Sequence, residues 1–376
     1  MKFGWIVSSV NDGKSIEYML KHDVGMSARL IRNFKAEGVT RRNGRESLVK
    51  SVARFGDVIT IELPLESDTL TLKSDLPFPV LFENDWVIVV NKPAGMIIHP
   101  TISEPEETLI DFLSDDPLSP VTRLDRYTSG AVIVAKNGHA HFFISEHPQT
   151  KEYIAYVHGD TRGDGLIYDV PASAETTVFD ERVAPLTIRD PATRAAYLRE
   201  RACPPGWEML YAPIERANYS FMNRVVHPFG KEAATFFRTE TFFPKYNVSK
   251  VRYRLITGRT HQIRVHSLWA GHPLLGDHLY GIARTTAEEQ YPLPRYSSIA
   301  LGVTGNVAVP TIDPGRFDAA NRLGDSEPNR TAEAFIRRQA LHAAAISFVD
   351  PLTRRRVELS APASDDLIAL DRSLSS

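Results

Sequence analysis

Three short apolar runs, rich in β-branched residues, constrain the fold of this chain more than any other feature of its sequence. They lie at residues 86–90, 131–135 and 153–157. Each has the length of a buried strand, and the first ends near the Lys92-Pro93 pair, which can simply terminate a strand. Further strands are expected near 233–243, 251–257 and 343–349, and helices over 138–147 and from about 260 onward. Strands and helices mix without a regular βαβ rhythm, so the pattern predicts an α+β domain on a mixed, mainly antiparallel sheet.

The composition places the chain among ordinary globular proteins. Its 376 residues are 43% hydrophobic and 24% charged, close to the average for folded domains. No stretch approaches the roughly 18 apolar residues of a membrane span, and Asp12 and Lys14 precede any signal-like apolar core. We therefore expect a cytoplasmic protein without a membrane anchor. The single cysteine, Cys203, excludes a disulfide framework and a cysteine-based zinc site, because both need several sulfurs.

Basic charge is concentrated at the front of the chain. Residues 1–65 hold eleven Lys or Arg and seven Asp or Glu, a balance of +4, so the remaining 311 residues sum to −6 within the total of −2. For this region the sequence predicts a helix around 16–21, an amphipathic helix over 27–35, a turn at 42–45 and an alternating strand at 55–63. A charged helix of this kind can also be no more than a solvated face.

The sequence predicts two domains. A small module is expected over 1–66, a linker over 67–79 and a larger domain over 80–376. Two stretches of the larger domain, about 168–208 and 282–334, are rich in proline and charged residues and carry little periodicity. We expect these two stretches to be surface excursions.

Asp125 is the first candidate for chemistry. It lies between Arg123 and Arg126, just before the buried run that begins at Ala131. Opposite charge nearby favours the ionised carboxylate, which can act as a nucleophile or a base. Such a cluster can equally be a surface ion-pair network, so the residues alone leave both interpretations open. The common phosphate-loop, nucleophile-elbow, zinc-protease and dinucleotide-binding motifs are absent from the sequence.

A second dense cluster of polar residues lies between positions 257 and 277. Thr260 is expected to cap the helix that follows, and Arg264 lies one turn inside that helix. An arginine there could make a bidentate contact with a carboxylate and so fix the orientation of that group. His261 and His266 are five residues apart, a spacing that puts them on different faces, so we expect structural histidines rather than a metal site.

Six motifs, in this order and approximate spacing, resemble the RluA family of RNA pseudouridine synthases. They lie at 91–95, 123–130, 151–155, 230–235, 257–266 and 338–342. The front of the chain similarly resembles a small RNA-binding module first described in a small-subunit ribosomal protein. Members of this family break the N-glycosidic bond of a uridine in RNA, rotate the uracil and rejoin it through carbon 5, without a metal or cofactor. The resemblance therefore implies an RNA partner and no cofactor.

The resemblance also implies roles for individual side chains. Asp125 corresponds to the catalytic aspartate, which either attacks the nucleotide covalently or removes a ribose proton. Tyr153 corresponds to the tyrosine that stacks on the uracil and serves as the base for the final proton, and Arg264 to the arginine paired with the aspartate. Arg123 corresponds to the arginine that holds the flipped-out site open. RNA contacts are further expected from Arg126, Arg259, His261, Arg29, Arg32, Lys35, Arg41, Arg42 and Arg45.

Some positions depart from the pattern of the family. Thr122 stands where histidine is usual, and Tyr127 where aspartate is often found. These changes concern the shape of the site and its RNA contacts, so the target uridine stays undefined. We expect a monomeric enzyme acting on large-subunit ribosomal RNA, with transfer RNA as the nearest alternative and a non-catalytic ribosome assembly factor as another. A nucleoside or glycoside hydrolase would need a second carboxylate about 5 to 10 Å from Asp125, and the sequence offers no convincing candidate.

Overall fold

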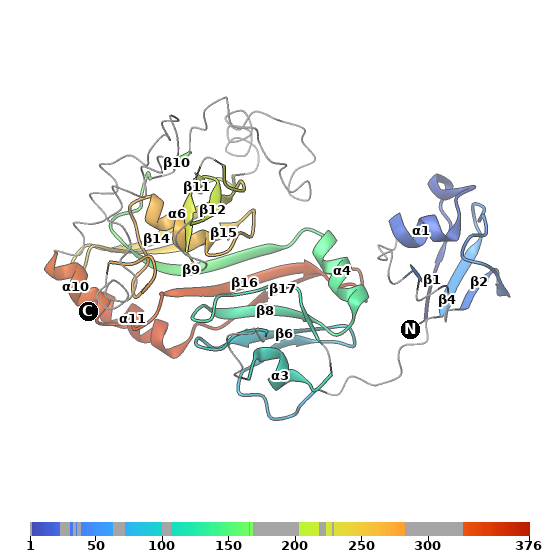
Figure 1. Cartoon of the computed structure of the whole chain (residues 1–376), viewed down its shortest axis with the longest axis horizontal. Coiled ribbons are helices and arrows are strands. Elements are labelled where there is room, and N and C mark those ends of the chain that lie inside the picture. The colour runs from blue at the N-terminus through green and yellow to red at the C-terminus, as the bar shows by residue number, and fades with distance from the viewer. Residues whose placement is uncertain are drawn as a thin grey trace.

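The structure is a computed structural model, and it describes twelve segments of the chain. They are residues 2–22, 31–32, 35, 39–62, 72–99, 107–116, 118–164, 166–167, 203–217, 223–227, 229–282 and 326–376. Within these segments the strands form two main sheets and one separate hairpin (Figure 1). In the same part of the chain, no helix is long and apolar enough to cross a membrane.

The N-terminal residues form a four-stranded antiparallel sheet in the order β1-β4-β2-β3. Its strands are β1 (Lys2–Ile6), β2 (Val39–Arg42), β3 (Arg45–Glu46) and β4 (Val58–Glu62), and its helical elements are η1 (Ser9–Asn11) and α1 (Ile16–His22). Asn43 and Gly44, at the tip of the β2–β3 hairpin, both have positive φ values, 52° and 81°. Two successive left-handed residues make the tight hairpin turn that the Asn-Gly pair predicts.

The predicted amphipathic helix of the N-terminal module is described at three positions only. Ile31, Arg32 and Lys35 are helical, with Ile31 buried and the two basic residues exposed. Ile31 packs in the same core as Ile16 of α1 and Ile59 of β4, as expected for the apolar face of the helix. The other residues predicted for this helix, Arg29 among them, lie outside the described residues.

The second sheet confirms the α+β prediction. It has eleven strands along the path β10-β11-β14-β15-β9-β16-β8-β6-β5, with β17 paired to β16 and β7 paired to β8. The pairs β8–β16 and β10–β11 are parallel and the others are antiparallel. Its strands are β5 (Val80–Glu83), β6 (Val87–Lys92), β7 (Ser119–Pro120), β8 (Ser129–Ala135), β9 (Thr150–His158), β10 (Leu166–Ile167), β11 (Glu208–Tyr211), β14 (Ala234–Phe243), β15 (Val248–Leu255), β16 (Leu341–Val349) and β17 (Arg356–Ser360).

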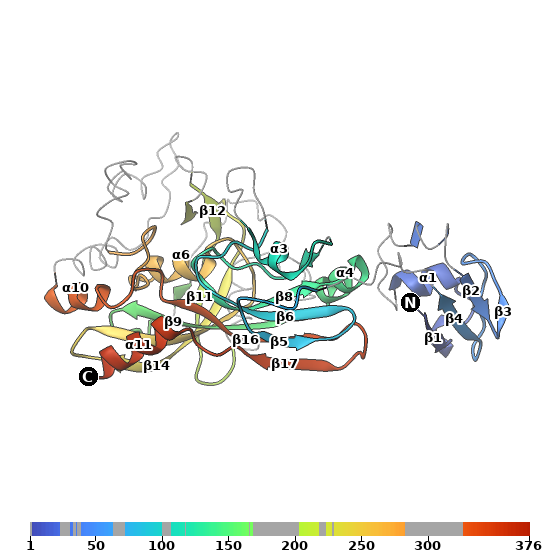
Figure 2. The same ribbon diagram turned by 90° about the horizontal axis from the view of Figure 1, so that it is seen from below.

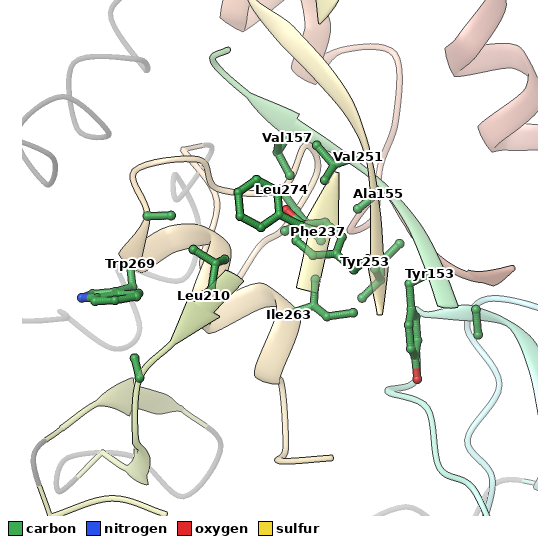
Figure 3. Packing of buried hydrophobic residues seen from close by; sticks show 14 residues of the cluster. Tyr153, Ala155, Val157, Leu210, Phe237, Val251, Tyr253, Ile263, Trp269 and Leu274 are labelled. Atoms are coloured by element: carbon green, nitrogen blue, oxygen red, sulfur yellow. The ribbon is translucent and has the colours of Figure 1, made fainter. Parts of the chain in front are cut away.

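Helices and a small hairpin accompany this sheet (Figure 2). The helices are α3 (Leu109–Leu113), α4 (Gly138–Glu146), α6 (Gln262–Trp269), α10 (Glu327–Glu333) and α11 (Asp365–Ser375), and the hairpin is β12 (Ile214–Arg216) with β13 (Arg224–Val226). The three apolar runs of the sequence are β6, β8 and β9, as predicted. Tyr153, Ala155 and Val157 alternate along β9 toward one face, where they pack with Ile263 and Trp269 of α6 (Figure 3).

The structure shows ordered residues at the boundaries expected from the sequence. Phe78 is buried and packs with Leu72, Leu76 and α3 against β6 and β8, within the stretch 67–79 that was expected to be a linker. The ends of both predicted excursions are also ordered elements, because β11 begins at Glu208 and α10 buries Ala332 in the core. Both regions lack the periodicity that would have revealed these elements. Residues 168–202 and 283–325 of these excursions lie outside the described residues.

Candidate active site

Asp125 lies on the loop that leads from β7 into β8. The loop turns at this residue, because the backbone N–H of Thr128 donates to the carbonyl oxygen of Asp125 at 3.0 Å. Gly130 then enters β8 with a φ of +117°, and a Cβ there would lie 2.3 Å from the carbonyl oxygen of Ala343. Only glycine lets β8 approach the parallel strand β16 so closely. The pairing of these two strands therefore fixes where the partly exposed carboxylate of Asp125 stands.

Arg264 connects two carboxylates at the start of α6. Its Nε and Nη2 donate to Oδ2 and Oδ1 of Asp277 at 2.7 and 2.8 Å, and its Nη1 donates to Oδ2 of Asp125 at 2.9 Å. The predicted pairing of Arg264 with Asp125 is therefore present. The predicted bidentate contact goes instead to Asp277, a residue that the sequence analysis did not single out, although it belongs to the dense cluster between positions 257 and 277.

The charges of this triad are mutually stabilised. Burial by itself raises the pKa of Asp277, but Arg264 and the backbone N–H groups of Leu279 and Tyr280 outweigh it, so the pKa lies below its usual range. Burial likewise lowers the pKa of Arg264, and the two carboxylates reverse this and raise it. Asp277 is thus a buried anion that holds the guanidinium in place, and one edge of the guanidinium is left for Asp125.

Among the described residues, the ion pair of Asp125 is with Arg264 rather than with either arginine that flanks it in the sequence. Arg126 Nε donates to the carbonyl oxygen of Gly95 at 3.2 Å, and Arg123 is exposed. Side chains of adjacent loop residues project in different directions, so charge proximity along the sequence did not become proximity in space. The counter-ion of Asp125 is Arg264, which comes from a distant part of the chain.

Lys92 braces the loops around Asp125. It ends β6, as the alternative interpretation of Lys92-Pro93 expected, but its buried Nζ also donates to the carbonyl oxygens of Pro93, Met96 and Arg126 at 2.9, 2.8 and 3.0 Å. Burial, with a smaller contribution from the positive charge of Arg338, lowers the pKa of Lys92 to about 7. The residue therefore links the end of β6 to the residue directly after Asp125.

Tyr153 stands at the edge of the core cluster on β9, directly opposite Tyr253 of β15. In Figure 3 its hydroxyl points away from the other labelled core side chains. Burial, and to a smaller extent the negative charge of Asp125, raise the pKa of Tyr153. The side chain is therefore a neutral phenol at neutral pH, and it lies close enough to Asp125 to sense its charge.

The two histidines of the cluster differ in their surroundings. His266 is buried between Thr235 Oγ1 and the carbonyl oxygen of Ala212, at 2.9 and 3.0 Å, and is the structural residue that was expected. His261 instead reaches the site, with its Nε2 3.8 Å from Oδ2 of Asp125. Within the described residues, no group of side chains could hold a metal ion.

The start of α6 also corrects one prediction. His261 occupies the cap position with a left-handed backbone (φ 57°), and the helix begins at Gln262. The side chain of Gln262 accepts the backbone N–H of Arg259 at 2.9 Å and the hydroxyl of Thr257 at 2.8 Å. Thr260 was expected to cap this helix, but the carboxamide of Gln262 satisfies the turn in its place.

The other residues that were predicted to contact RNA differ in whether their charged groups already bond to protein atoms. Arg259 Nε donates to the carbonyl oxygen of Glu232 at 3.0 Å. In the N-terminal module, Lys35 pairs with Glu17 at 2.7 Å, Arg41 with Glu62 at 2.7 Å, and Arg42 donates to the carbonyl oxygen of Val52 at 2.7 Å. Arg32 and Arg45 are exposed. Of the predicted contacts of this module that the structure describes, Arg32 and Arg45 are therefore the exposed ones without an ion pair to another described residue.

A comparison with known families identifies the chain. The model of a family described as RNA pseudouridylate synthase matches residues 86–269, which include Asp125, Tyr153 and Arg264. The chain belongs to the RNA pseudouridylate synthase family. It is therefore an RNA pseudouridine synthase, an isomerase that converts uridine to pseudouridine in RNA.

Individual relatives of this synthase come from several bacteria. The ribosomal large subunit pseudouridine synthase D of Vibrio cholerae is 28% identical over 331 residues, which cover 85% of this chain and 78% of the relative. A Bacillus subtilis protein, named as the uncharacterized RNA pseudouridine synthase YjbO, is 28% identical over 362 residues, 93% of this chain and 95% of the relative. The solved human RNA Pseudouridylate Synthase Domain Containing 4 aligns with a TM-score of 0.45 and 16% identity over 79% of this chain and 92% of its own.

Proposed function

We propose that this synthase modifies a uridine of large-subunit ribosomal RNA and that Asp125 is its reacting carboxylate. The observation that carries the second part is the arrangement Asp277–Arg264–Asp125, in which a buried anion aims a guanidinium at a partly exposed carboxylate. The first part is supported by the names of the relatives, several of which are ribosomal large subunit pseudouridine synthases.

In this proposal the two oxygens of Asp125 have different tasks. Oδ2 receives the hydrogen bond from Arg264, which fixes the orientation of the carboxylate. Oδ1 has no hydrogen-bond partner among the described residues, so it is the oxygen free to react. It either attacks the ribose carbon 1′, forming an ester as uracil leaves, or takes the proton from carbon 2′ as the bond from carbon 1′ to uracil breaks, giving a glycal and free uracil.

We assign Tyr153 the task of stacking on the flipped uracil. A uridine in structured RNA must leave its stack, which costs a few kcal/mol, and an aromatic face that receives the base offsets that cost. The buried, neutral phenol of Tyr153, next to Asp125, is suited to this contact. The raised pKa makes the phenolate scarce in the free enzyme, which favours stacking over proton abstraction as its main contribution.

The N-terminal module is proposed as a second RNA contact. Its charge balance of +4 over residues 1–65 is suited to phosphate binding, which is sequence-independent and weakens with salt. Arg32 and Arg45, the exposed members of the predicted set, are the best placed to contribute. We further propose that the synthase acts as a monomer in the cytoplasm.

Pseudouridine mapping of total RNA tests the choice of substrate. Carbodiimide-dependent reverse-transcription stops are compared between cells with and without this gene, and then after rescue with the wild type or with Asp125→Asn. Loss of one or a few sites in large-subunit ribosomal RNA, restored by the wild type alone, is the expected result. Sites lost only from transfer RNA would overturn the proposed substrate, and no lost site at all would favour the assembly-factor alternative.

A further inference from the structure

His261 lies between the catalytic carboxylate and a buried tyrosine. We infer that Tyr280 fixes His261 as the neutral tautomer with its proton on Nε2, so that the dipole of this N–H faces Asp125 in addition to the hydrogen bond from Arg264. The inference rests on the proposed role of Asp125. It makes His261 a positioning residue for the reaction and Tyr280 the residue that sets its protonation pattern.

The backbone at the start of α6 directs the imidazole to this place. His261 is the residue before the helix and has a left-handed φ of 57°. Its side chain therefore points in a different direction from that of a residue with helical backbone angles. Its Nδ1 lies 2.9 Å from Oη of Tyr280, and its Nε2 lies 3.8 Å from Oδ2 of Asp125. The two ring nitrogens therefore face two different groups, and the proton on one excludes a proton on the other in the neutral ring.

The hydroxyl of Tyr280 decides which nitrogen is protonated. Oη accepts the backbone N–H of Arg224 at 2.8 Å, so its own hydrogen needs a separate acceptor. Within the described residues, Nδ1 of His261 is the only acceptor bonded to this hydroxyl. Tyr280 is almost completely buried, and a buried hydroxyl without an acceptor costs free energy. Nδ1 therefore accepts the tyrosine hydrogen, which leaves the imidazole proton on Nε2.

The charge of Asp125 favours the same tautomer independently. With the proton on Nδ1, the lone pair of Nε2 would face an anionic oxygen 3.8 Å away, which is repulsive. With the proton on Nε2, an N–H dipole points at that oxygen, which is attractive. Burial lowers the pKa of His261 to about 4, although Asp125 opposes the shift. The ring is therefore neutral at neutral pH and carries one proton rather than two.

Arg264 and His261 face the same oxygen of Asp125, the first through a hydrogen bond and the second through the dipole of its N–H. Arg264 donates directly to Oδ2 at 2.9 Å, and the Nε2–H of His261 approaches Oδ2 from 3.8 Å, too far for a direct hydrogen bond. Negative charge is thereby held on Oδ2 while Oδ1 keeps no partner among the described residues. Tyr280 also lies under the guanidinium, with its ring centre 4.9 Å from Cζ of Arg264, so one tyrosine supports both residues.

Two substitutions of His261 separate the contributions of its nitrogens. His261→Asn places an amide near the position of Nδ1 and keeps a partner for Tyr280, but it removes the group that faces Asp125. His261→Gln extends an amide N–H to about the position of Nε2. We expect the single-turnover rate at saturating RNA to fall about ten-fold in His261→Asn, with an RNA Kd within about three-fold, and to recover most of that loss in His261→Gln.

A matched pair of tyrosine variants tests the control of the tautomer. Tyr280→Phe removes the hydrogen that Nδ1 accepts, and the rate is expected to fall several-fold. Tyr253→Phe is the control, because Tyr253 is also fully buried but its hydroxyl bonds Ser267 at 2.8 Å, away from Asp125. Nitrogen-15 NMR of histidine-labelled protein reads the tautomer directly, with His261 assigned from its Asn variant. The wild type is expected to carry the proton on Nε2, and Tyr280→Phe a mixture.

Distinct results would overturn the inference. Equal rates in His261→Gln and His261→Asn would mean that the donor facing Asp125 has no effect, and protonated Nδ1 in the wild type would exclude the tautomer. If Tyr280→Phe fails to fold, the two His261 variants and the NMR spectrum decide alone. Activity retained in Asp125→Asn would instead contradict the proposed function, and that result is separate from any obtained with His261.

Discussion

Asp277 holds the guanidinium of Arg264 through two hydrogen bonds of 2.7 and 2.8 Å. Because this carboxylate is fully buried and negative, it anchors the arginine from behind and sets the direction of the third donor, which reaches Asp125 at 2.9 Å. The carboxylate that we propose as the reacting group is thus oriented through a residue that is itself fully buried.

Asp277→Asn should damage both stability and rate. The amide removes the buried negative charge and turns an N–H₂ toward the guanidinium, and breaking a buried ion pair costs about 3–5 kcal/mol. We expect a loss of this order in the free energy of unfolding by urea and a fall of about 100-fold in the single-turnover rate. Asp371→Asn is the control, because its pair with Lys250 is partly exposed and is worth at most about 1 kcal/mol. Equal effects of the two substitutions would contradict the anchoring role.

Lys92→Met should disturb the loop of Asp125 without touching substrate. Methionine matches the length of the buried stem but removes three hydrogen bonds that Lys92 donates to backbone carbonyls. One of these carbonyls belongs to Arg126, the neighbour of Asp125. Each unpaired carbonyl costs about 1 kcal/mol or more. The single-turnover rate should fall at least ten-fold while the Kd for RNA changes little. A rate equal to that of the wild type would show that the brace does not position the loop.

Stability should fall as the pH drops below about 6.5 because of three buried histidines. Burial lowers the pKa values of His139, His261 and His266 to about 4 each, whereas in the unfolded chain these values are about 6.5. The unfolded state therefore binds more protons between pH 6.5 and 4, and stability is lost as the pH falls through that window. Each group contributes a slope of up to about 1.4 kcal/mol per pH unit.

His139→Leu isolates one of these three contributions. Among the described residues, neither ring nitrogen of His139 has a hydrogen-bond partner, so an apolar replacement is expected to cost little at pH 7.5. Urea unfolding at several pH values should show a shallower decline between pH 6.5 and 4 than in the wild type. His141→Leu, on the same helix but partly exposed, is the control. An unchanged slope in His139→Leu would contradict the assignment.

The N-terminal module should contribute to the salt dependence of RNA binding. Replacing Arg32 and Arg45 by alanine is expected to reduce the slope of log K against log salt by up to about 0.7–0.9 for each residue. Arg41→Ala should change it less, because Arg41 already pairs with Glu62 at 2.7 Å. Arg355→Ala, an exposed position on the turn before β17, is the control. A slope unchanged in the double variant would mean that these side chains do not contact phosphates.

Much of the fold could be predicted because its strands carry local signals. The apolar runs of β6, β8 and β9 are short and β-branched, and the Asn43-Gly44 turn specifies its hairpin. The excursions gave no such signal. The local sequence pattern does not predict an element such as α10, because its burial depends on contacts with strands that are distant in the sequence.

Part of the site could also be predicted from the sequence. Motif resemblance brought Asp125 and Arg264 together, and the structure places them in hydrogen-bond contact. The flanking arginines were weighted too heavily, because adjacency along a loop does not determine where side chains point. Asp277 and Tyr280 were missed, because their importance arises only when the chain after α6 folds back on Arg264 and His261. The dense polar cluster between positions 257 and 277 was the signal that could have revealed Asp277, whereas Tyr280 lies beyond it.

The most direct test of the account is the isomerisation rate of Asp125→Asn. Tritium release from RNA labelled at carbon 5 of uridine is measured under single-turnover conditions, with the Kd for the same RNA measured in parallel. The exposed Asp115→Asn serves as a matched control. The account predicts no detectable release by Asp125→Asn, an RNA affinity within a few-fold of the wild type, and full activity in the control. Release at a rate comparable to that of the wild type would contradict the central claim that the Asp125 carboxylate performs the reaction.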